Sequence, residues 1–374
     1  MKQIVYLKQE IIEWAVQESE YSLDFALAKN PFLGKALDGE PITFKQLQNL
    51  SLFFKIPFGY FFYNQVPERN KISAEFRTIG NKKKQVFSKN LKDVLLDMDY
   101  KKNWMSDYRK KNGYEKFAFN NYLCLNEGFD TNIEKIRDLL ALDVEWYRNL
   151  DGSNSTFDFL KRRIESLGIL VMESSVVGNN QNRKIDINDF RGFALSDEYT
   201  PLIFINNNDK NEARCFTLMH EVLHLLNESK DDIFVNIDND VEKKINKYVA
   251  EILIPFSILR VKTANVNEID PVFVKKMAAY FKVSIYAMAV RMLNFNIISK
   301  DFFDDLIDGI NNYINKTGGG NYYANLELKT STVFSNAVFE SVYSNKITFT
   351  QGYKLLGLRG NTFDVFGGRT YAKH

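Results

Sequence analysis

Two of the three histidines in this 374-residue chain lie four positions apart, in His220-Glu221-Val222-Leu223-His224. On a helix, positions i and i+4 share one face and lie about one turn apart, so both imidazoles can bind the same metal ion. The intervening Glu221 then lies beside that ion. The pattern therefore predicts a zinc site with His220 and His224 as two of its ligands.

A hydrolytic zinc site needs a third protein ligand and leaves the fourth position to water. Glu251 is the preferred candidate, because it lies among apolar residues in a helix predicted to end at Pro255. An unpaired carboxylate would be costly to bury there, and a metal would supply its partner. Glu242 and Glu228 are the competing candidates.

The chemistry expected of such a site is hydrolysis of a peptide bond. Zinc lowers the pKa of its bound water to about 7. Glu221 would take the proton as the resulting hydroxide attacks a carbonyl, and would return it to the leaving amine. The second donor to the oxyanion stays open among three tyrosines, which are Tyr248, Tyr322 and Tyr323. His374, at the end of the sequence, is expected to have no role in the site.

The elements around the motif predict an α+β, mostly helical fold, with a zincin-like peptidase domain over residues 151–300. Apolar runs predict a small antiparallel sheet immediately before the metal-binding helix of residues 211–228. The strands are expected at 169–172, 193–195 and 202–205, and the other helices at 157–167, about 240–253, 271–281 and 284–293.

Three further domains are predicted outside the peptidase segment. Residues 1–70 contain short helices separated by tight turns, including one with Thr43 as its N-cap, and suggest a helix-turn-helix domain. Residues 71–150 form a basic helical linker domain. Residues 301–374 form a helical C-terminal domain, in which residues 348–366 contain two short helices around a glycine turn.

The composition is that of a folded, water-soluble protein, with 45% hydrophobic and 26% charged residues. Cys124 and Cys215 lie far apart, so neither a disulfide framework nor a cysteine-based zinc site is expected. The chain shows no signal-peptide pattern and no stretch of 18 uncharged apolar residues. A cytoplasmic location without membrane contact is therefore expected.

The distribution of charge bears on a nucleic-acid partner. Residues 1–70 hold 7 basic and 8 acidic side chains, whereas residues 71–116 hold 13 basic and 6 acidic ones. DNA affinity depends largely on lysine and arginine, so the first segment is better suited to a protein partner. The better DNA candidate lies in the second segment and comprises Lys82, Lys83, Lys84, Lys89, Lys92, Lys101 and Lys102.

The segments around the motif resemble the ImmA/IrrE metallopeptidase family. The resemblance rests on residues 190–197, 201–206, 216–224 and 246–255. It implies that Glu251 is the third zinc ligand. Residues 41–47, 56–60, 75–78, 319–323 and 355–357 resemble the long form of this family, in which an Xre-like helix-turn-helix domain precedes the peptidase.

The family implies a cytosolic zinc endopeptidase, commonly encoded on prophages and other mobile elements. Its members cleave or inactivate a helix-turn-helix repressor, and some long-form members accompany toxin genes. The leading hypothesis is therefore regulatory cleavage of a repressor or of a neighbouring gene's product. The alternative is a DNA-binding regulator or antitoxin whose peptidase domain is a metal-bound scaffold. A third possibility is a sensor in which metal occupancy reports stress.

Overall fold

The computed structural model describes most of the chain in two compact units. The described residues are 3–19, 21–66, 88–125, 127–148, 150, 152–227, 239–311, 330–358 and 360–370. One unit comprises residues 1–74 and 84–93, and the other comprises residues 75–83 and 94–374. The finer division into four domains, with boundaries at residues 70, 150 and 300, stays a prediction.

The N-terminal unit is a small group of helices with a two-stranded ribbon. Strand β1 (Ile4–Val5) pairs antiparallel with β2 (Ile42–Thr43). The helices are α1 (Gln9–Ser19), α2 (Leu23–Lys29), α3 (Phe32–Leu37), α4 (Phe44–Phe54) and the 3-10 helix η1 (Phe58–Phe62).

The predicted start of one helix in this unit is confirmed. Thr43 caps α4 as predicted, and a reciprocal hydrogen bond with Gln46 completes a capping box. Apolar side chains such as Ile11, Leu47 and Phe54 form a separate core for this unit. The interpretation of the unit as a helix-turn-helix domain stays a prediction.

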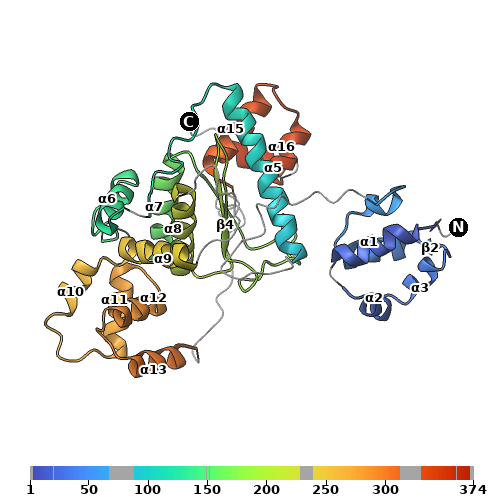
Figure 1. Ribbon diagram of the computed structural model, residues 1–374. Coiled ribbons are helices and arrows are strands. Elements are labelled where there is room, and N and C mark those ends of the chain that lie inside the picture. The colour runs from blue at the N-terminus through green and yellow to red at the C-terminus, as the bar shows by residue number, and fades with distance from the viewer. Residues whose placement is uncertain are drawn as a thin grey trace. The chain divides into compact units, whose positions relative to one another are not determined.

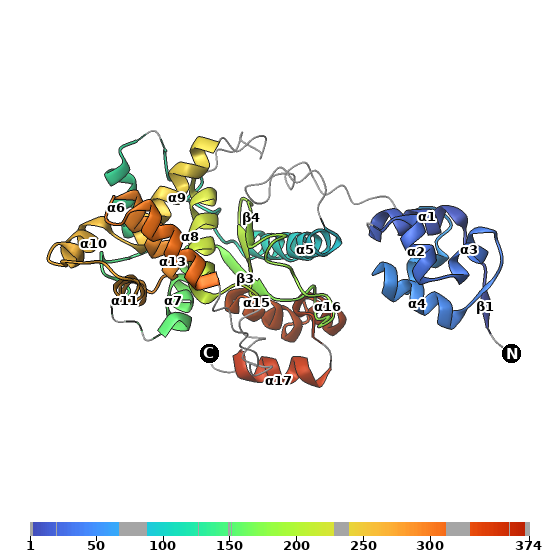
Figure 2. The ribbon, with the colours of Figure 1, turned by 90° about the horizontal axis from the view of Figure 1, so that it is seen from below.

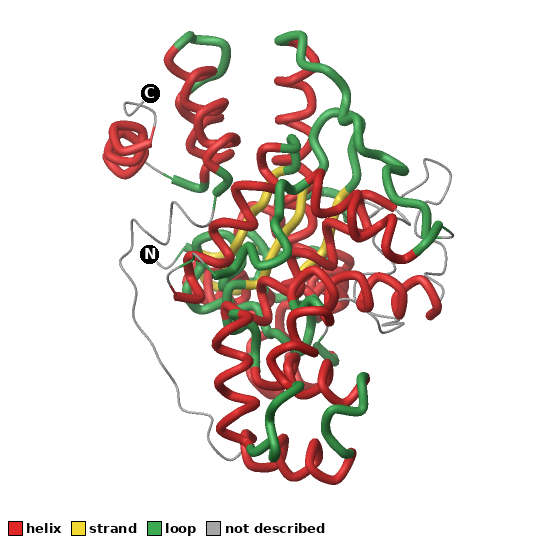
Figure 3. Tube along the Cα trace, turned by 90° about the vertical axis from the view of Figure 1, so that its left-hand side faces the viewer, coloured by secondary structure: helices red, strands yellow, loops and turns green. Residues whose placement is uncertain are grey.

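A three-stranded sheet lies at the centre of the second unit (Figure 3). It contains β3 (Leu170–Ser174), β4 (Gly192–Leu195) and β5 (Leu202–Asn206), in the order β3-β5-β4. The strands lie close to their predicted positions, but the prediction of an antiparallel sheet is wrong for one pair. Strand β5 pairs antiparallel with β4 and parallel with β3.

The central position of β5 explains this mixed arrangement. All five residues of β5 are buried, so the strand is best placed where both neighbours and both faces cover it. Ile203 and Ile205 contribute to the core shared with the metal-motif helix. Phe204 lies opposite Phe193 of β4 and stacks on it with ring centroids 5.2 Å apart.

Helices cover both faces of the sheet (Figure 1). On one face lie α7 (Gly152–Ser166) and α8 (Asn211–Asn227). On the other lie α5 (Lys89–Lys111) and α15 (Thr332–Tyr343). These two helices are joined by the ring contact of Trp104 with Phe334 and by a hydrogen bond from the Tyr108 hydroxyl to Glu340.

The remaining helices complete the second unit (Figure 2). They are α6 (Phe129–Leu139), α9 (Asn239–Leu253), α10 (Phe256–Thr263), α11 (Pro271–Phe281), α12 (Ile285–Asn294), α13 (Lys300–Asn311), α16 (Phe349–Leu356) and α17 (Asn361–Thr370). The helices predicted near 240–253, 271–281 and 284–293 are therefore confirmed.

The two short C-terminal helices are confirmed as well, with Gly357 ending α16 in the left-handed conformation at φ 67°. The fold class is α+β and mostly helical, as predicted. Within the described residues, no helix has both the length and the apolar character needed to cross a membrane.

Candidate metal centre

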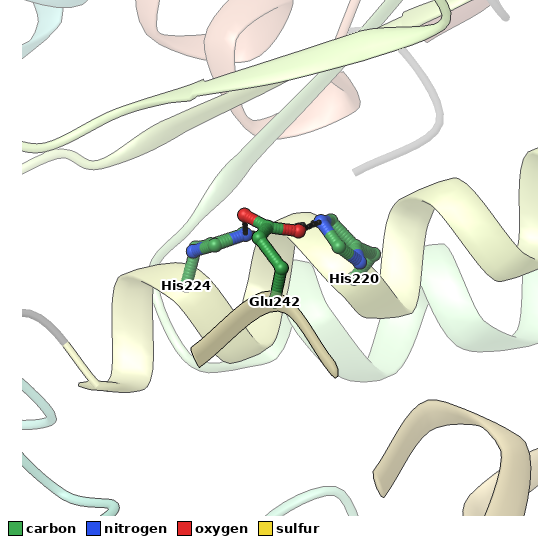
Figure 4. A group of neighbouring side chains, drawn as sticks. All are labelled: His220, His224 and Glu242. Carbon is green, nitrogen blue, oxygen red and sulfur yellow. Dashed lines mark hydrogen bonds and ion pairs between the residues drawn. The ribbon is translucent and has the colours of Figure 1, made fainter. Parts of the chain in front are cut away.

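Helix α8 presents both motif histidines on one face. Its opposite face is anchored in the core by buried side chains such as Leu218, Val222 and Leu225. His220 and His224 therefore lie side by side, with ring centroids 4.6 Å apart and their Nε2 atoms 3.0 Å apart (Figure 4). The sequence-based placement of this pair on one helical face is confirmed.

Helix α9 adds a carboxylate to the pair. Glu242 places Oε1 3.1 Å from His224 Nε2 and Oε2 3.4 Å from His220 Nε2. One potential ligand atom from each of the three residues lies within 4.8 Å of the other two. Among the described residues, this is the group of histidine, cysteine and acidic side chains that could hold a metal ion.

Glu251, the preferred candidate for the third ligand, is not part of the histidine cluster in this structure. Glu251 forms an ion pair with Arg291 of α12, whose side chain is only 4% exposed. Its other oxygen accepts a hydrogen bond of 3.1 Å from the Phe256 amide at the start of α10. The expectation that this half-buried carboxylate needs a partner was sound, but the partner is a guanidinium and not a metal. Glu242, one of the two alternatives, lies beside the histidines instead.

Of the remaining candidates, Tyr248 is described by the structure and does not join this cluster. Tyr248 is 4% exposed, stacks on Phe129 of α6, and accepts a hydrogen bond of 3.0 Å from the Asn132 side chain. Its hydroxyl is thus engaged in the core between α6 and α9, which does not support an oxyanion role. Glu228, Tyr322, Tyr323 and His374 lie outside the described residues.

A residue that the sequence analysis did not select also contacts the pair. The Asn246 side-chain oxygen lies 3.1 Å from His220 Nδ1, the ring nitrogen on the far side from Nε2. Glu242 and Asn246 are four positions apart on α9, as His220 and His224 are on α8. This second i, i+4 pair of polar residues on a helix with an apolar face was the signal available in the sequence.

The charges of the cluster reinforce one another in the metal-free protein. Burial pushes the pKa of Glu242 upward, but the adjacent His220 and His224 side chains outweigh it and lower the pKa to about 2. Burial likewise lowers the pKa of His220, but Glu242 and Glu221 outweigh it and raise the pKa above its usual value. The Glu242 carboxylate and the imidazoles therefore attract each other in the folded protein. A metal cation could take the place of the protons that join these groups.

Glu221 lies in the field of the same groups. Burial raises the pKa of its carboxyl, whereas the nearby His220 and His224 oppose the rise. A carboxyl group with a raised pKa is better able to hold and release a proton near neutral pH. The position of Glu221 between the two histidines on α8 is thus consistent with a proton-transfer role.

The donor set fits a zinc ion. Two imidazoles and one carboxylate are a known ligand set of catalytic zinc sites, with a further position left for water. Glu242 Oε2 is buried and has no hydrogen-bond partner among the described residues, so it is free to accept a metal ion. His220, His224 and Glu242 would therefore hold the ion.

A buried ion network holds α8 in place behind the site. Glu173 of β3 is fully buried and binds Arg214 of α8 together with Lys161 of α7, at 3.1 Å for the lysine. The Arg214 guanidinium also lies 4.1 Å from the ring centroid of Phe157. Because each buried charge in this network has a partner, the network fixes α8 against both β3 and α7.

The close contact of β4 with α8 depends on a glycine. A Cβ atom at Gly192 would lie 2.7 Å from the Thr217 methyl carbon and 2.9 Å from the Phe204 carbonyl oxygen. Thr217 precedes Glu221 by about one helical turn. Gly192 therefore allows β4 to run directly against the part of α8 that carries the motif.

Part of the basic segment proposed for DNA binding is engaged within the protein. Lys101 pairs with Asp97 at 2.7 Å, and Lys102 pairs with Asp99 at 3.1 Å. Both lysines are less than 10% exposed. They are thus poorly placed to contact phosphates. The run Lys82, Lys83 and Lys84 lies outside the described residues.

In the second unit, one helix bears the motif and the next places a carboxylate beside it. Residues 164–293 match the family model of the IrrE N-terminal-like domain, Peptidase_M78. This segment contains the whole candidate site, and the match supports the resemblance to the ImmA/IrrE family. Residues 330–369 match a domain of unknown function, DUF8813. Comparison with curated proteins and with solved structures gave no match.

Proposed function

We propose that this protein is a zinc-dependent endopeptidase that cleaves a chosen partner protein. The observation that carries the proposal is the convergence of His220, His224 and Glu242 within 4.8 Å. The match of the surrounding segment to the IrrE N-terminal-like domain supports it. The expected partner is a helix-turn-helix repressor or the product of a neighbouring gene.

Each residue of the site has a separate role in the proposed reaction. A zinc ion held by the three ligands would supply Lewis acidity toward water and the substrate carbonyl. Glu221 removes a proton from the attacking water and delivers it to the amine that leaves. The raised pKa of its carboxyl suits both transfers.

Strand β4 is a suitable place to hold an extended substrate. It lies at the end of the sheet and pairs with β5 alone among the described strands. An end strand can add a peptide through main-chain hydrogen bonds, which require no particular substrate sequence. Since Gly192 brings β4 against α8 at Thr217, a peptide paired with β4 would lie near Glu221.

The N-terminal unit is proposed to recognise the partner protein. Large apolar side chains are exposed on it, including Leu52 at 76%, Tyr6 at 69% and Phe25 at 43%. Exposed apolar groups of this kind favour contact with protein over contact with DNA. The excess of acidic over basic side chains in residues 1–70 agrees with this preference.

The test is co-expression of the wild-type chain or the Glu221→Gln variant with the neighbouring gene's product. Glu221→Gln keeps the size of the side chain but removes the proton acceptor, so only the wild type should cleave the partner. The variant should still bind zinc, because Glu221 is not one of the three ligands. An intact partner beside zinc-loaded wild type would contradict the proposal, as would equal cleavage by both chains.

A further inference from the structure

Asn246 faces the metal centre from the side opposite to the ligand atoms. Its Oδ1 lies 3.1 Å from Nδ1 of His220, whereas Nε2 of the same ring points to Glu242 and His224. A carboxamide oxygen accepts hydrogen bonds and cannot donate them. With Oδ1 as the acceptor, Nδ1 carries the proton of this contact, which leaves the lone pair of a neutral ring on Nε2.

The orientation of the His220 ring is restrained on a second side. Phe216, one turn earlier on α8, stacks on the ring with centroids 6.4 Å apart. The Asn246 hydrogen bond lies in the plane of the ring and the Phe216 contact on its face, so the two contacts restrict rotation about different directions. The ring is thus held in one orientation before any metal arrives.

The element that carries Asn246 is itself fixed. Helix α9 is tied to α12 by the ion pair of Glu251 with Arg291 and to α6 by the hydrogen bond between Asn132 and Tyr248. The half-buried Asn246 therefore approaches His220 from a rigid support. Because Glu242 is on the same helix one turn earlier, α9 provides both a ligand and a restraint on a ligand of α8.

We propose that Asn246 is a positioning residue of the metal centre. It selects the Nδ1-protonated tautomer of His220 and directs Nε2 toward the metal position. This inference rests on the proposed metal site and extends it to a residue that does not touch the ion. Hydrogen-bond partners of metal-bound histidines commonly change metal affinity by about 10- to 100-fold.

The experiment compares four full-length chains: wild type, Asn246→Ala, Asn246→Asp and Lys243→Ala. Zinc affinity is measured by competition with a chromogenic chelator, and thermal unfolding is recorded for each metal-free chain. Lys243 is the matched control, because it lies on the same helix next to Glu242 with its side chain 78% exposed. Asp retains an oxygen acceptor at position 246, whereas Ala removes it.

We expect Asn246→Ala to weaken zinc binding by about 10-fold or more, and Asn246→Asp to restore most of the affinity. The absorption spectrum of the Co²⁺ form should change in the Ala variant and stay close to that of the wild type in the Asp variant. At a pH above the raised pKa of His220, long-range nitrogen–proton NMR spectra of the metal-free wild type should show the ring protonated on Nδ1 alone. The Ala variant should show a mixture of both tautomers.

Two outcomes would overturn the role of Asn246 and leave the metal site intact. One is zinc affinity in Asn246→Ala equal to that of Lys243→Ala and wild type. The other is an Asp variant as weak as the Ala variant, with His220 in the same tautomer in all chains. If the wild type itself binds no zinc, the proposed function fails. That result can be distinguished from the two outcomes above, in which the wild type does bind zinc.

Discussion

Glu242 of α9 lies with Oε1 3.1 Å from Nε2 of His224 on α8, and this contact joins two helices that meet around the motif. The candidate metal site is therefore not contained in one helix. Two histidines come from α8, and a carboxylate together with an asparagine comes from α9. A metal ion at this position would connect the two helices directly.

The identity of the third ligand can be tested by exchanging each glutamate separately. Glu242→Gln should lower zinc affinity by about 100-fold, because the variant loses an anionic ligand. Glu251→Gln should leave zinc binding close to that of wild type. Zinc content after dialysis and competition with a chelator would measure both effects. Loss of zinc from the Glu251 variant with retention in the Glu242 variant would reverse the assignment.

The Glu251→Gln variant should fold less stably than the wild type, although its zinc binding is expected to be unchanged. Arg291 would remain buried with its charge only partly satisfied, and removing one partner of a buried ion pair costs about 3 kcal/mol or more. Urea unfolding of the zinc-loaded variant and of the wild type would show this difference. Lys243→Ala serves again as the control on α9, since its exposed side chain should change stability little.

Metal removal should destabilise the second unit. A ligand that binds only the folded state stabilises it by about 2.7 kcal/mol when its free concentration is 100 times its dissociation constant. Thermal unfolding should therefore shift to lower temperature on treatment with a chelator and return on addition of zinc. The shift should vanish in His220→Ala. An equal shift in that variant would mean that the ion binds elsewhere.

The metal-free protein should show a characteristic dependence of stability on pH. The folded-state pKa of Glu242 is lowered from 4.5 to about 2. Its contribution to the stability of the fold is therefore complete above pH 4.5 and is lost as the pH falls toward 2. The folded-state pKa of His220 is raised above 6.5, so its contribution is complete below 6.5 and is lost as the pH rises through the raised value.

Both contributions are thus complete between pH 4.5 and 6.5. Urea unfolding of chelator-treated wild type and Glu242→Gln, from below pH 4.5 to above pH 6.5, would measure the difference in stability between them. The difference should be largest inside the window and should shrink on both sides. A constant difference from acid to alkaline pH would argue against the coupling of these two groups.

The packing of β4 against α8 gives a further prediction. Gly192→Ala should destabilise the protein by about 1–3 kcal/mol, because the new methyl group would overlap the Thr217 methyl carbon and the Phe204 carbonyl oxygen. Gly309→Ala is the matched control on α13, where an added Cβ meets nothing within 4 Å. The control should be neutral or slightly stabilising, since alanine is the better helix former.

Local patterns in the sequence predicted the helices and strands well. Three correct predictions depend only on neighbours a few positions away. They are the capping residue Thr43, the end of the helix before Pro255 and the helical spacing around His220. Such neighbours are visible in the sequence. The direction of strand pairing is not, because a short buried apolar run such as that of β5 can belong to a strand paired in either direction. The parallel pairing of β3 with β5 was therefore missed.

The third ligand of the site also depends on tertiary contacts that local sequence patterns do not reveal. The burial of Glu251 could be inferred from its apolar neighbours, but its partner Arg291 lies in a different helix and has no local signature. Glu242 lies among mostly polar residues in the sequence, which give no local sign that it is partly buried. The contact of Asn246 with His220 depends on how α8 and α9 cross, and this crossing is a property of the tertiary structure alone.

The glycine at position 192 has a consequence for how substrate preference could change. Since the Thr217 methyl group and the Phe204 carbonyl fill the space beside its α-carbon, no larger residue fits without moving the strand. The separation between β4 and the motif helix is therefore a fixed dimension of the scaffold. If β4 holds the substrate as proposed, new preferences would have to arise from side chains bordering the strand, while the depth at which the peptide lies stays constant.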